Sequence, residues 1–204
     1  GVAVLDLSSI NLIPGQIDLV ITSFNTIPHQ NTLNIITPEG AYLVYNSYEI
    51  VNDDNDLIEY GETLELNLVI ENVGQYNTNA IVIEVETEDQ YIIMDNSESQ
   101  IAYAIAGETA TTENPISFSI NNNVPDGHYA LFAVSLNDGE DNWNFTFNIE
   151  INAPVFEIAN PAIADENNDG IWDPGEEATI TVDLINSGSA SFNYYPGATI
   201  ATDN

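Results

Sequence analysis

Apolar residues along this chain recur at every second position in many short segments, with polar residues between them. The segment TLELNLVIE at 63–71 places four apolar side chains on one face, while Glu65 and Asn67 begin the opposite face before Val69 interrupts it. A period of two residues is typical of a β-strand with one buried face and one face in water. Similar strand patterns occur at 16–24, 80–87, 145–152 and 177–185.

Turn signals rich in Gly, Pro, Asn and Asp separate these segments. No stretch of helical length carries apolar residues at the 3.6-residue period of an amphipathic helix. Many short strands with frequent turns are typical of antiparallel β-sandwiches. We therefore predict an all-β chain of tandem Ig-like antiparallel β-sandwiches without substantial helix. The turn signals lie at 13–16, 38–40, 72–77, 124–128, 137–141 and 186–189.

An internal repeat relates two parts of the sequence. The segment GETLELNLVIENVG, which starts at Gly61, aligns without gaps to GEEATITVDLINSG, which starts at Gly175, so the offset is 114 residues. Just upstream, residues 53–60 match residues 167–174. A period of about 110 residues suits one Ig-like sandwich per repeat.

The repeat divides the chain into three expected units. Residues 41–153 would form a complete Ig-like sandwich of the CARDB type, and residues 154–204 the N-terminal half of a further one. Residues 1–40 would be the C-terminal half of a preceding sandwich. The sequence has no initiator Met and starts inside a strand-like pattern, so we expect a processed or excised piece of a longer product.

The charge balance is extreme, with 33 Asp and Glu residues, no Lys or Arg, and a formal net charge of −33. Nucleic acids, phosphates and anionic membranes are bound by basic side chains, so none is an expected partner. Divalent cations would relieve the self-repulsion of so acidic a chain. Three explanations of the missing bases stay open: an acidic surface suited to salty water, selection against proteases specific for Lys and Arg, and an inferred or engineered sequence.

Other sequence features exclude further kinds of site and activity. The chain has no Cys, so disulfides, thiolate metal sites and a Cys nucleophile are excluded. No apolar run approaches the roughly 18 residues of a membrane-spanning helix, so membrane insertion is not expected. Neither His29 nor His128 lies near a recognisable partner in the sequence, and no catalytic motif is present. We therefore do not expect an enzyme.

Residues 165–176 read DENNDGIWDPGE and fit the calcium-loop pattern D-x-[DN]-x-[DN]-G-x5-E without a mismatch. Alternating oxygen ligands in such a loop wrap one Ca²⁺. The candidate ligands are the side chains of Asp165, Asn167, Asp169, Asp173 and Glu176 and the backbone carbonyl of Ile171. Because Pro174 and Gly175 preclude the exiting helix of an EF-hand, we expect a calcium turn between two strands. The alternative is an acidic turn without a metal.

The matching loop at 51–62 is degraded, because Val51 occupies the first ligand position. Its remaining candidate ligands are Asp53, Asn55, Glu59 and Glu62. This loop could bind Ca²⁺ in an altered geometry or only weakly. The acidic stretch at 137–141 is most simply a hairpin turn.

The repeats resemble a known family. The segments PDGHYALFAVSL at 125–136 and APVFEIA at 153–159, together with the 165–176 loop, look like Ig-like, CARDB-type β-sandwich modules. Such modules follow gingipain-like (C25 family) cysteine peptidase domains in secreted surface proteins of Bacteroidota and related bacteria. The segment ITSFNTIP at 21–28 resembles the end of the Ig-like domain that follows such a catalytic domain. The resemblance implies an extracellular, tandem-sandwich segment, but no peptidase activity, because the family's catalytic Cys has no counterpart here.

We therefore expect a non-catalytic extracellular or cell-surface segment with a structural or adhesive role, stiffened by Ca²⁺. Its partners would be neighbouring Ig-like domains, a surface glycan or protein, or further copies joined head to tail into a filament by strand complementation. The alternative is a calcium-dependent carbohydrate- or protein-binding module appended to a secreted peptidase. For sugar binding, Trp143 and Trp172 would be the stacking candidates.

Overall fold

The computed structural model describes residue 4 and residues 14–52, 57–166 and 169–192. These residues form thirteen β-strands in four sheets whose strands pair antiparallel, and they contain no helix. The predicted all-β class is therefore confirmed for this part of the chain. No helix among the described residues is long and apolar enough to cross a membrane.

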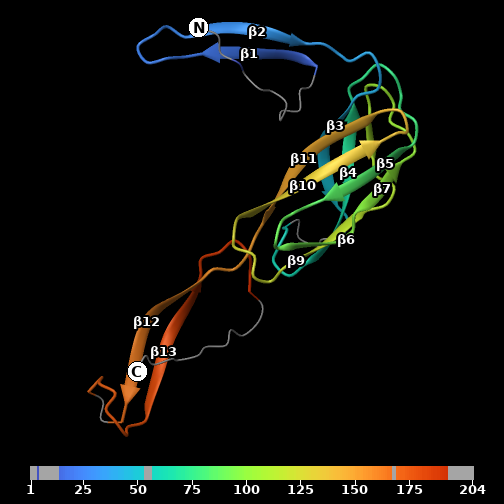
Figure 1. Cartoon of the computed structure of the whole chain (residues 1–204). Coiled ribbons are helices and arrows are strands. Elements are labelled where there is room, and N and C mark those ends of the chain that lie inside the picture. The colour runs from blue at the N-terminus through green and yellow to red at the C-terminus, as the bar shows by residue number, and fades with distance from the viewer. Residues whose placement is uncertain (1–3, 5–13, 53–56, 167–168, 193–204) are drawn as a thin grey trace.

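Two facing sheets form the centre of the molecule (Figure 1). One sheet has the strand order β3-β4-β9-β6, and β8 also pairs with β4. Its strands are β3 (Leu43–Ile50), β4 (Thr63–Asn72), β6 (Ile92–Asn96), β8 (Thr109–Thr111) and β9 (Ile116–Ile120). The other sheet has the order β11-β10-β5-β7. Its strands are β5 (Ile81–Glu86), β7 (Glu98–Ile101), β10 (His128–Asn137) and β11 (Asn142–Ile151).

The core lies between these sheets. Along β10 and β11 buried and exposed residues alternate, as the sequence pattern predicts. The ring of Phe147 in β11 stacks on the rings of Phe132 in β10 and Tyr45 in β3, with centroid separations of 5.2 and 5.4 Å. Because β3 belongs to the other sheet, aromatic side chains of both sheets are in contact. Every buried member of the hydrophobic core lies between Leu43 and Ala153, inside the 41–153 interval.

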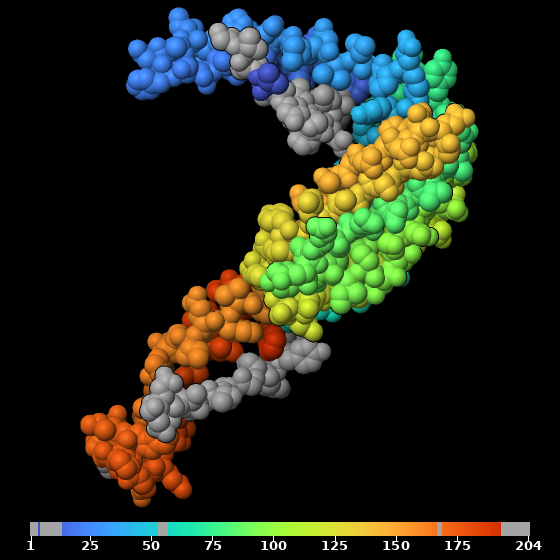
Figure 2. Space-filling view, viewed as in Figure 1, coloured from blue at the N-terminus to red at the C-terminus, as the bar shows by residue number. Residues whose placement is uncertain are grey.

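Two separate hairpins project from opposite ends of this sandwich (Figure 1). The N-terminal hairpin pairs β1 (Gly15–Ile21) with β2 (His29–Ile35), and the C-terminal hairpin pairs β12 (Phe156–Asp165) with β13 (Ala178–Asn186). Most of their side chains are exposed, and the space-filling view shows each hairpin as a slender arm (Figure 2). Among the described residues no further sheet packs against either arm, and an isolated two-stranded hairpin is marginally stable at best.

The C-terminal hairpin repeats the pairing of β3 with β4. In the part of the ladder that the two hairpins share, eight residues of the first strand lie opposite seven of the second, because the first strand contains one extra residue at a bulge. The β12–β13 ladder continues beyond this part to the pair Asp165–Ala178. The corresponding pairs at the two ends of this shared part are Leu43–Asn72 with Phe156–Asn186, and Ile50–Leu66 with Ile163–Ile180.

The hydrogen bonds at the end of each hairpin also correspond. The side-chain oxygen of Asn72 accepts from the backbone N–H groups of Tyr42 at 3.1 Å and Gly74 at 3.0 Å. The side-chain oxygen of Asn186 accepts from the N–H groups of Val155 at 3.0 Å and Gly188 at 3.1 Å. A Cβ at Gly74 or Gly188 would overlap the backbone of the preceding linker, so the glycines of the aligned segments are required by close backbone approach.

Candidate metal centre

The loop that carries the calcium motif joins β12 to β13 at the far end of the C-terminal hairpin (Figure 1). Asp165 is the last residue of β12, so the strand fixes the position of the first candidate ligand. Gly170 has a φ of 80°, a conformation that glycine adopts without steric strain. A strand follows the loop, as expected from Pro174 and Gly175.

Asp165 has the most unusual environment in this loop. Its side chain is only 7% exposed. One carboxylate oxygen, Oδ2, accepts the backbone N–H of Gly170 at 2.8 Å. The other oxygen, Oδ1, is buried and has no hydrogen-bond partner among the described residues. Burying an uncompensated carboxylate oxygen is costly, and a bound cation would remove that cost.

The other described ligand candidates take part in the turn itself. Asp169 Oδ1 accepts the backbone N–H of Ile171 at 2.8 Å, and Glu176 Oε2 accepts that of Asp173 at 3.3 Å. The indole N–H of Trp172 donates to the backbone carbonyl of Glu176 at 2.9 Å. These bonds give the loop a defined turn shape.

The candidate ligands are not gathered into one cluster. Among the described residues, no three His, Cys, Asp or Glu side chains lie close enough together to hold a metal ion. Asn167 lies outside the described residues. A hollow of about 690 Å³ borders Asp165 and also reaches Glu166 and Glu177. The hard-oxygen chemistry and the unpartnered Asp165 oxygen fit Ca²⁺, but the remaining ligands would have to converge when the ion binds.

The degraded loop at 51–62 has a structural role at the joint that follows the sandwich. Asp53 and Asn55 lie outside the described residues. The backbone N–H of Glu59 donates to Glu62 Oε2 at 2.9 Å, which matches the bond between Asp173 and Glu176. The backbone of this loop also bonds to Asn152, where the chain leaves β11: Asn152 N–H donates to Ile58 O at 2.8 Å. This loop therefore ties the end of the sandwich together.

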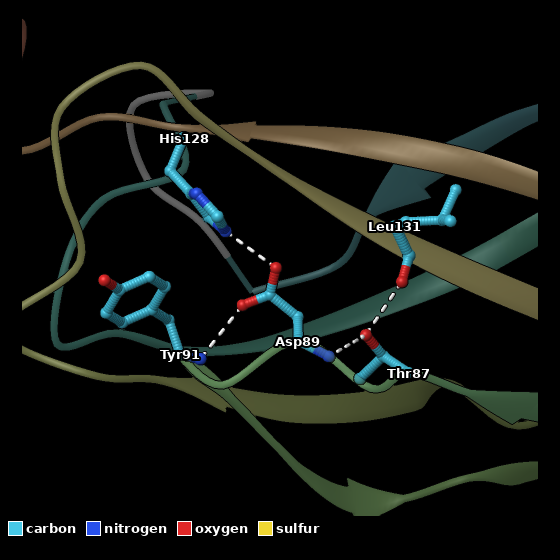
Figure 3. Close-up of polar contacts among 5 residues, drawn as sticks. All are labelled: Thr87, Asp89, Tyr91, His128 and Leu131. Atoms are coloured by element: carbon cyan, nitrogen blue, oxygen red, sulfur yellow. Dashed lines mark hydrogen bonds and ion pairs between the residues drawn. The ribbon is translucent and has the colours of Figure 1, made fainter.

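His128 has a partner that the sequence did not reveal. Its Nε2 lies 2.7 Å from Asp89 Oδ2, and the ring of Tyr91 packs edge-on against the imidazole (Figure 3). Asp89 Oδ1 accepts the backbone N–H of Tyr91, and the hydroxyl of Thr87 donates to the carbonyl of Leu131. These contacts fasten the β5–β6 connection to β10. Asp89 is 39 residues from His128 in a chain full of acids, so no local pattern marks the pair.

The remaining candidates have structural explanations. Residues 138–141 form the turn between β10 and β11, and Asp138 Oδ1 accepts the N–H groups of Glu140 and Asp141. Trp143 is buried in the core and cannot stack on a sugar. Trp172 is exposed beside the calcium motif.

Comparisons with known proteins give little further information. No protein-family model matches the chain, and no curated protein matches it. Among solved structures, it is similar to native alpha-2-macroglobulin from Escherichia coli, in a crystal structure spanning domain MG7 to the C-terminus. That match has 11% identity and a TM-score of 0.36, and it covers 64% of this chain and 21% of the other. No family assignment follows from these results.

Proposed function

We propose that this chain is a non-catalytic structural segment of an extracellular or cell-surface protein, built from tandem Ig-like sandwich modules and stiffened by Ca²⁺. The observation that carries the proposal is the C-terminal hairpin, which repeats the register and the terminal asparagine bonds of β3–β4 and ends in a loop with a buried, unpartnered Asp165 oxygen. A repeated hairpin with this much shared detail supports a repeated module.

The calcium loop would act as a clamp at one end of such a module. Asp165, Asn167, Asp169, Asp173 and Glu176 and the carbonyl of Ile171 would hold the ion. Bound Ca²⁺ supplies positive charge and oxygen coordination. The chain's own contribution is to fix Asp165 at the end of β12 and to hold Glu176 two residues before β13 begins. Drawing these two ends together would rigidify the hairpin.

This role fits an environment rich in calcium. The stabilisation by a bound ion is RT ln(1 + [L]/Kd), which reaches about 2.7 kcal/mol when the free ion is at 100 times Kd. A loop of modest affinity is therefore filled only where calcium is abundant, as it is outside cells. That argument supports the extracellular location that we propose.

Calcium titration of the whole chain tests the proposal, because Trp172 reports on the loop while Trp143 is buried in the core. Ca²⁺ should change the emission of Trp172, and the change should be absent in Trp172→Phe. Asp165→Asn should weaken binding at least about tenfold, since a charged ligand is lost. Asp141→Asn, in the acidic turn between β10 and β11, is the matched control and should bind like the unmodified chain.

Two results would reject calcium binding. One is no heat of binding and no change in emission up to millimolar Ca²⁺. The other is equal weakening by Asp165→Asn and Asp141→Asn, which would indicate diffuse attraction to an acidic surface instead of a site.

A second candidate function, calcium-dependent carbohydrate binding, is favoured by one observation, the exposure of Trp172 beside the loop. A glycan array probed with and without EGTA would detect it. Hits that require both Ca²⁺ and Trp172 would support this function over a purely structural role.

A further inference from the structure

One face of the C-terminal hairpin is apolar, and the described residues leave most of it uncovered. Cross-strand pairing and alternation place six large apolar side chains on this face, which we call the open face: Phe156, Ile158, Ile163, Ile180, Val182 and Leu184. The ring of Phe156, at one end of the face, packs edge-on against Phe192 with ring centroids 4.9 Å apart. Val182 is 45% exposed and Leu184 44%, whereas their counterparts in β4, Leu68 and Ile70, are fully buried. The open face therefore has the apolar composition of a core surface, and among the described residues no second sheet covers it.

The central sandwich shows what covers the corresponding face. There, β3 and β4 pack against the opposite sheet, in which β10 and β11 form a hairpin. Tyr45 and Tyr48 of β3 contact the ring of Phe147 in β11 at 5.4 and 5.9 Å. A hairpin of the β10–β11 type thus supplies part of the apolar cover that the open face lacks.

The N-terminal hairpin is of this type. In the chain, β10–β11 comes directly before β12, and β12 corresponds to β3. The N-terminal hairpin β1–β2 comes directly before β3 itself, so it occupies the equivalent place in the chain. Its register places Ile17 opposite Leu33 and Gly15 opposite Ile35. Five apolar side chains therefore share one side of this hairpin, which we call the N-terminal apolar face: Ile17, Leu19, Ile21, Leu33 and Ile35. The opposite face is polar apart from Val20.

We propose that the N-terminal apolar face of a second copy of this chain packs on the open face, so that two half-sandwiches from different copies form one sandwich core. The two hairpins project from opposite ends of the sandwich (Figures 1 and 2), so those of one chain are held apart. When two copies join through two different surfaces, the pair still has one unused copy of each surface. Further copies can therefore add to both ends, head to tail. This inference rests on the modular role proposed above, but it does not require calcium.

Cysteine cross-linking tests the contact, because the chain contains no cysteine of its own. Leu19→Cys and Val182→Cys are prepared as separate proteins, mixed, and treated with a short bifunctional thiol reagent. We expect cross-linked dimers in the mixture and only background amounts in either protein alone. Thr181→Cys, on the opposite face of β13, replaces Val182→Cys in the matched control and should give background cross-linking.

The alternatives produce different products. Dimers from Val182→Cys alone would indicate a symmetric contact between two C-terminal hairpins. A cross-linked monomer from the double variant Leu19→Cys/Val182→Cys would show that a chain closes on itself. Either product, or no cross-linking at any concentration up to millimolar, overturns the proposal.

A charge on the open face tests the contact energetically. Val182→Asp should lower the apparent association constant at least about tenfold, since the contact would bury an unpaired carboxylate. Thr181→Asp adds the same charge to the same strand on the other face, and should change association far less. Equal effects of the two variants would show that general charge repulsion, and not contact at the open face, weakens association. Loss of calcium binding with intact cross-linking would reject the clamp and leave this contact standing.

Discussion

At the residue scale, Asp126 holds the joint between the sandwich and the C-terminal hairpin. Its Oδ1 accepts the backbone N–H of Ala153 at 2.9 Å, and its carboxylate also accepts the backbone N–H and the hydroxyl of Ser189 at 3.2 Å. The bond from the Ala153 N–H, followed by those from Ser189, lowers the pKa of Asp126 below its ordinary value. The ionised form therefore favours the joined arrangement.

The lowered pKa predicts how the joint responds to acid. A depressed carboxyl pKa contributes stability above the ordinary Asp pKa of about 3.9. That contribution is lost as the pH falls through the lowered pKa. The Ser189 amide should therefore exchange its hydrogen faster, relative to its intrinsic rate, once the pH falls through that range. Asp126→Asn should show the faster exchange already at pH 7. Slow exchange in Asp126→Asn at pH 7 would show that the carboxylate does not hold the joint.

Some residues of the candidate metal centre can be predicted from local sequence, and other features of the described loops cannot. Loop spacing alone predicts Asp165 and its neighbours as candidate oxygen ligands. The burial of Asp165 Oδ1 depends on how the hairpin folds around it, and the pairing of His128 with Asp89 depends on the packing of distant loops. Both lie beyond any local pattern.

At the scale of elements, alternation located β1, β4, β5, β11 and β13, and it missed the ten-residue strands β10 and β12 as well as shorter strands such as β8. The segments predicted at 63–71 and 80–87 correspond to β4 and β5, and the segment at 145–152 forms most of β11. The three-residue strand β8 pairs with residues 69–71 of β4. A strand this short has too few residues to show a period, so its existence depends on tertiary pairing.

Val69 shows how the structure resolves an exception in the pattern. It interrupts the polar face of β4, yet it is buried. It lies next to the bulge between Tyr45 and Ser47 and pairs with Thr111 of β8. The bulge disturbs the ladder locally and β8 adds cover, so the apolar residue is buried at a position that simple alternation assigns to water.

The two corresponding asparagines give a prediction about elements. Asn72 is fully buried, and its side-chain amide donates to the carbonyls of Tyr76 and Ala104. Asn72→Ala would leave these carbonyls and the N–H groups of Tyr42 and Gly74 without that partner. It should lower the free energy of unfolding of the sandwich by about 2–4 kcal/mol. Urea unfolding followed through the buried Trp143 measures this change.

Asn186→Ala is the matched control, because Asn186 makes the equivalent bonds in the C-terminal hairpin outside the core. It should leave the unfolding of the sandwich unchanged to within about 0.5 kcal/mol. A comparable loss from both variants would mean that the hairpin and the sandwich unfold as one cooperative unit.

At the scale of the whole molecule, charge and apolar surface act against each other. A formal charge of −33 keeps copies of the chain apart, while the open face and the N-terminal apolar face favour contact. Salt screens the repulsion, with a Debye length of about 8 Å at 0.15 M ionic strength, and leaves the apolar attraction in place. We therefore expect association to strengthen as salt or Ca²⁺ is added.

The most direct measurement is electron microscopy of the unmodified chain at high protein concentration in physiological salt, with Ca²⁺ and with EGTA. The account predicts linear head-to-tail strings in which each contact between copies is a sandwich formed by β12–β13 of one copy and β1–β2 of the next, with longer strings in Ca²⁺. Monodisperse single molecules under both conditions, or closed symmetric pairs, would contradict it.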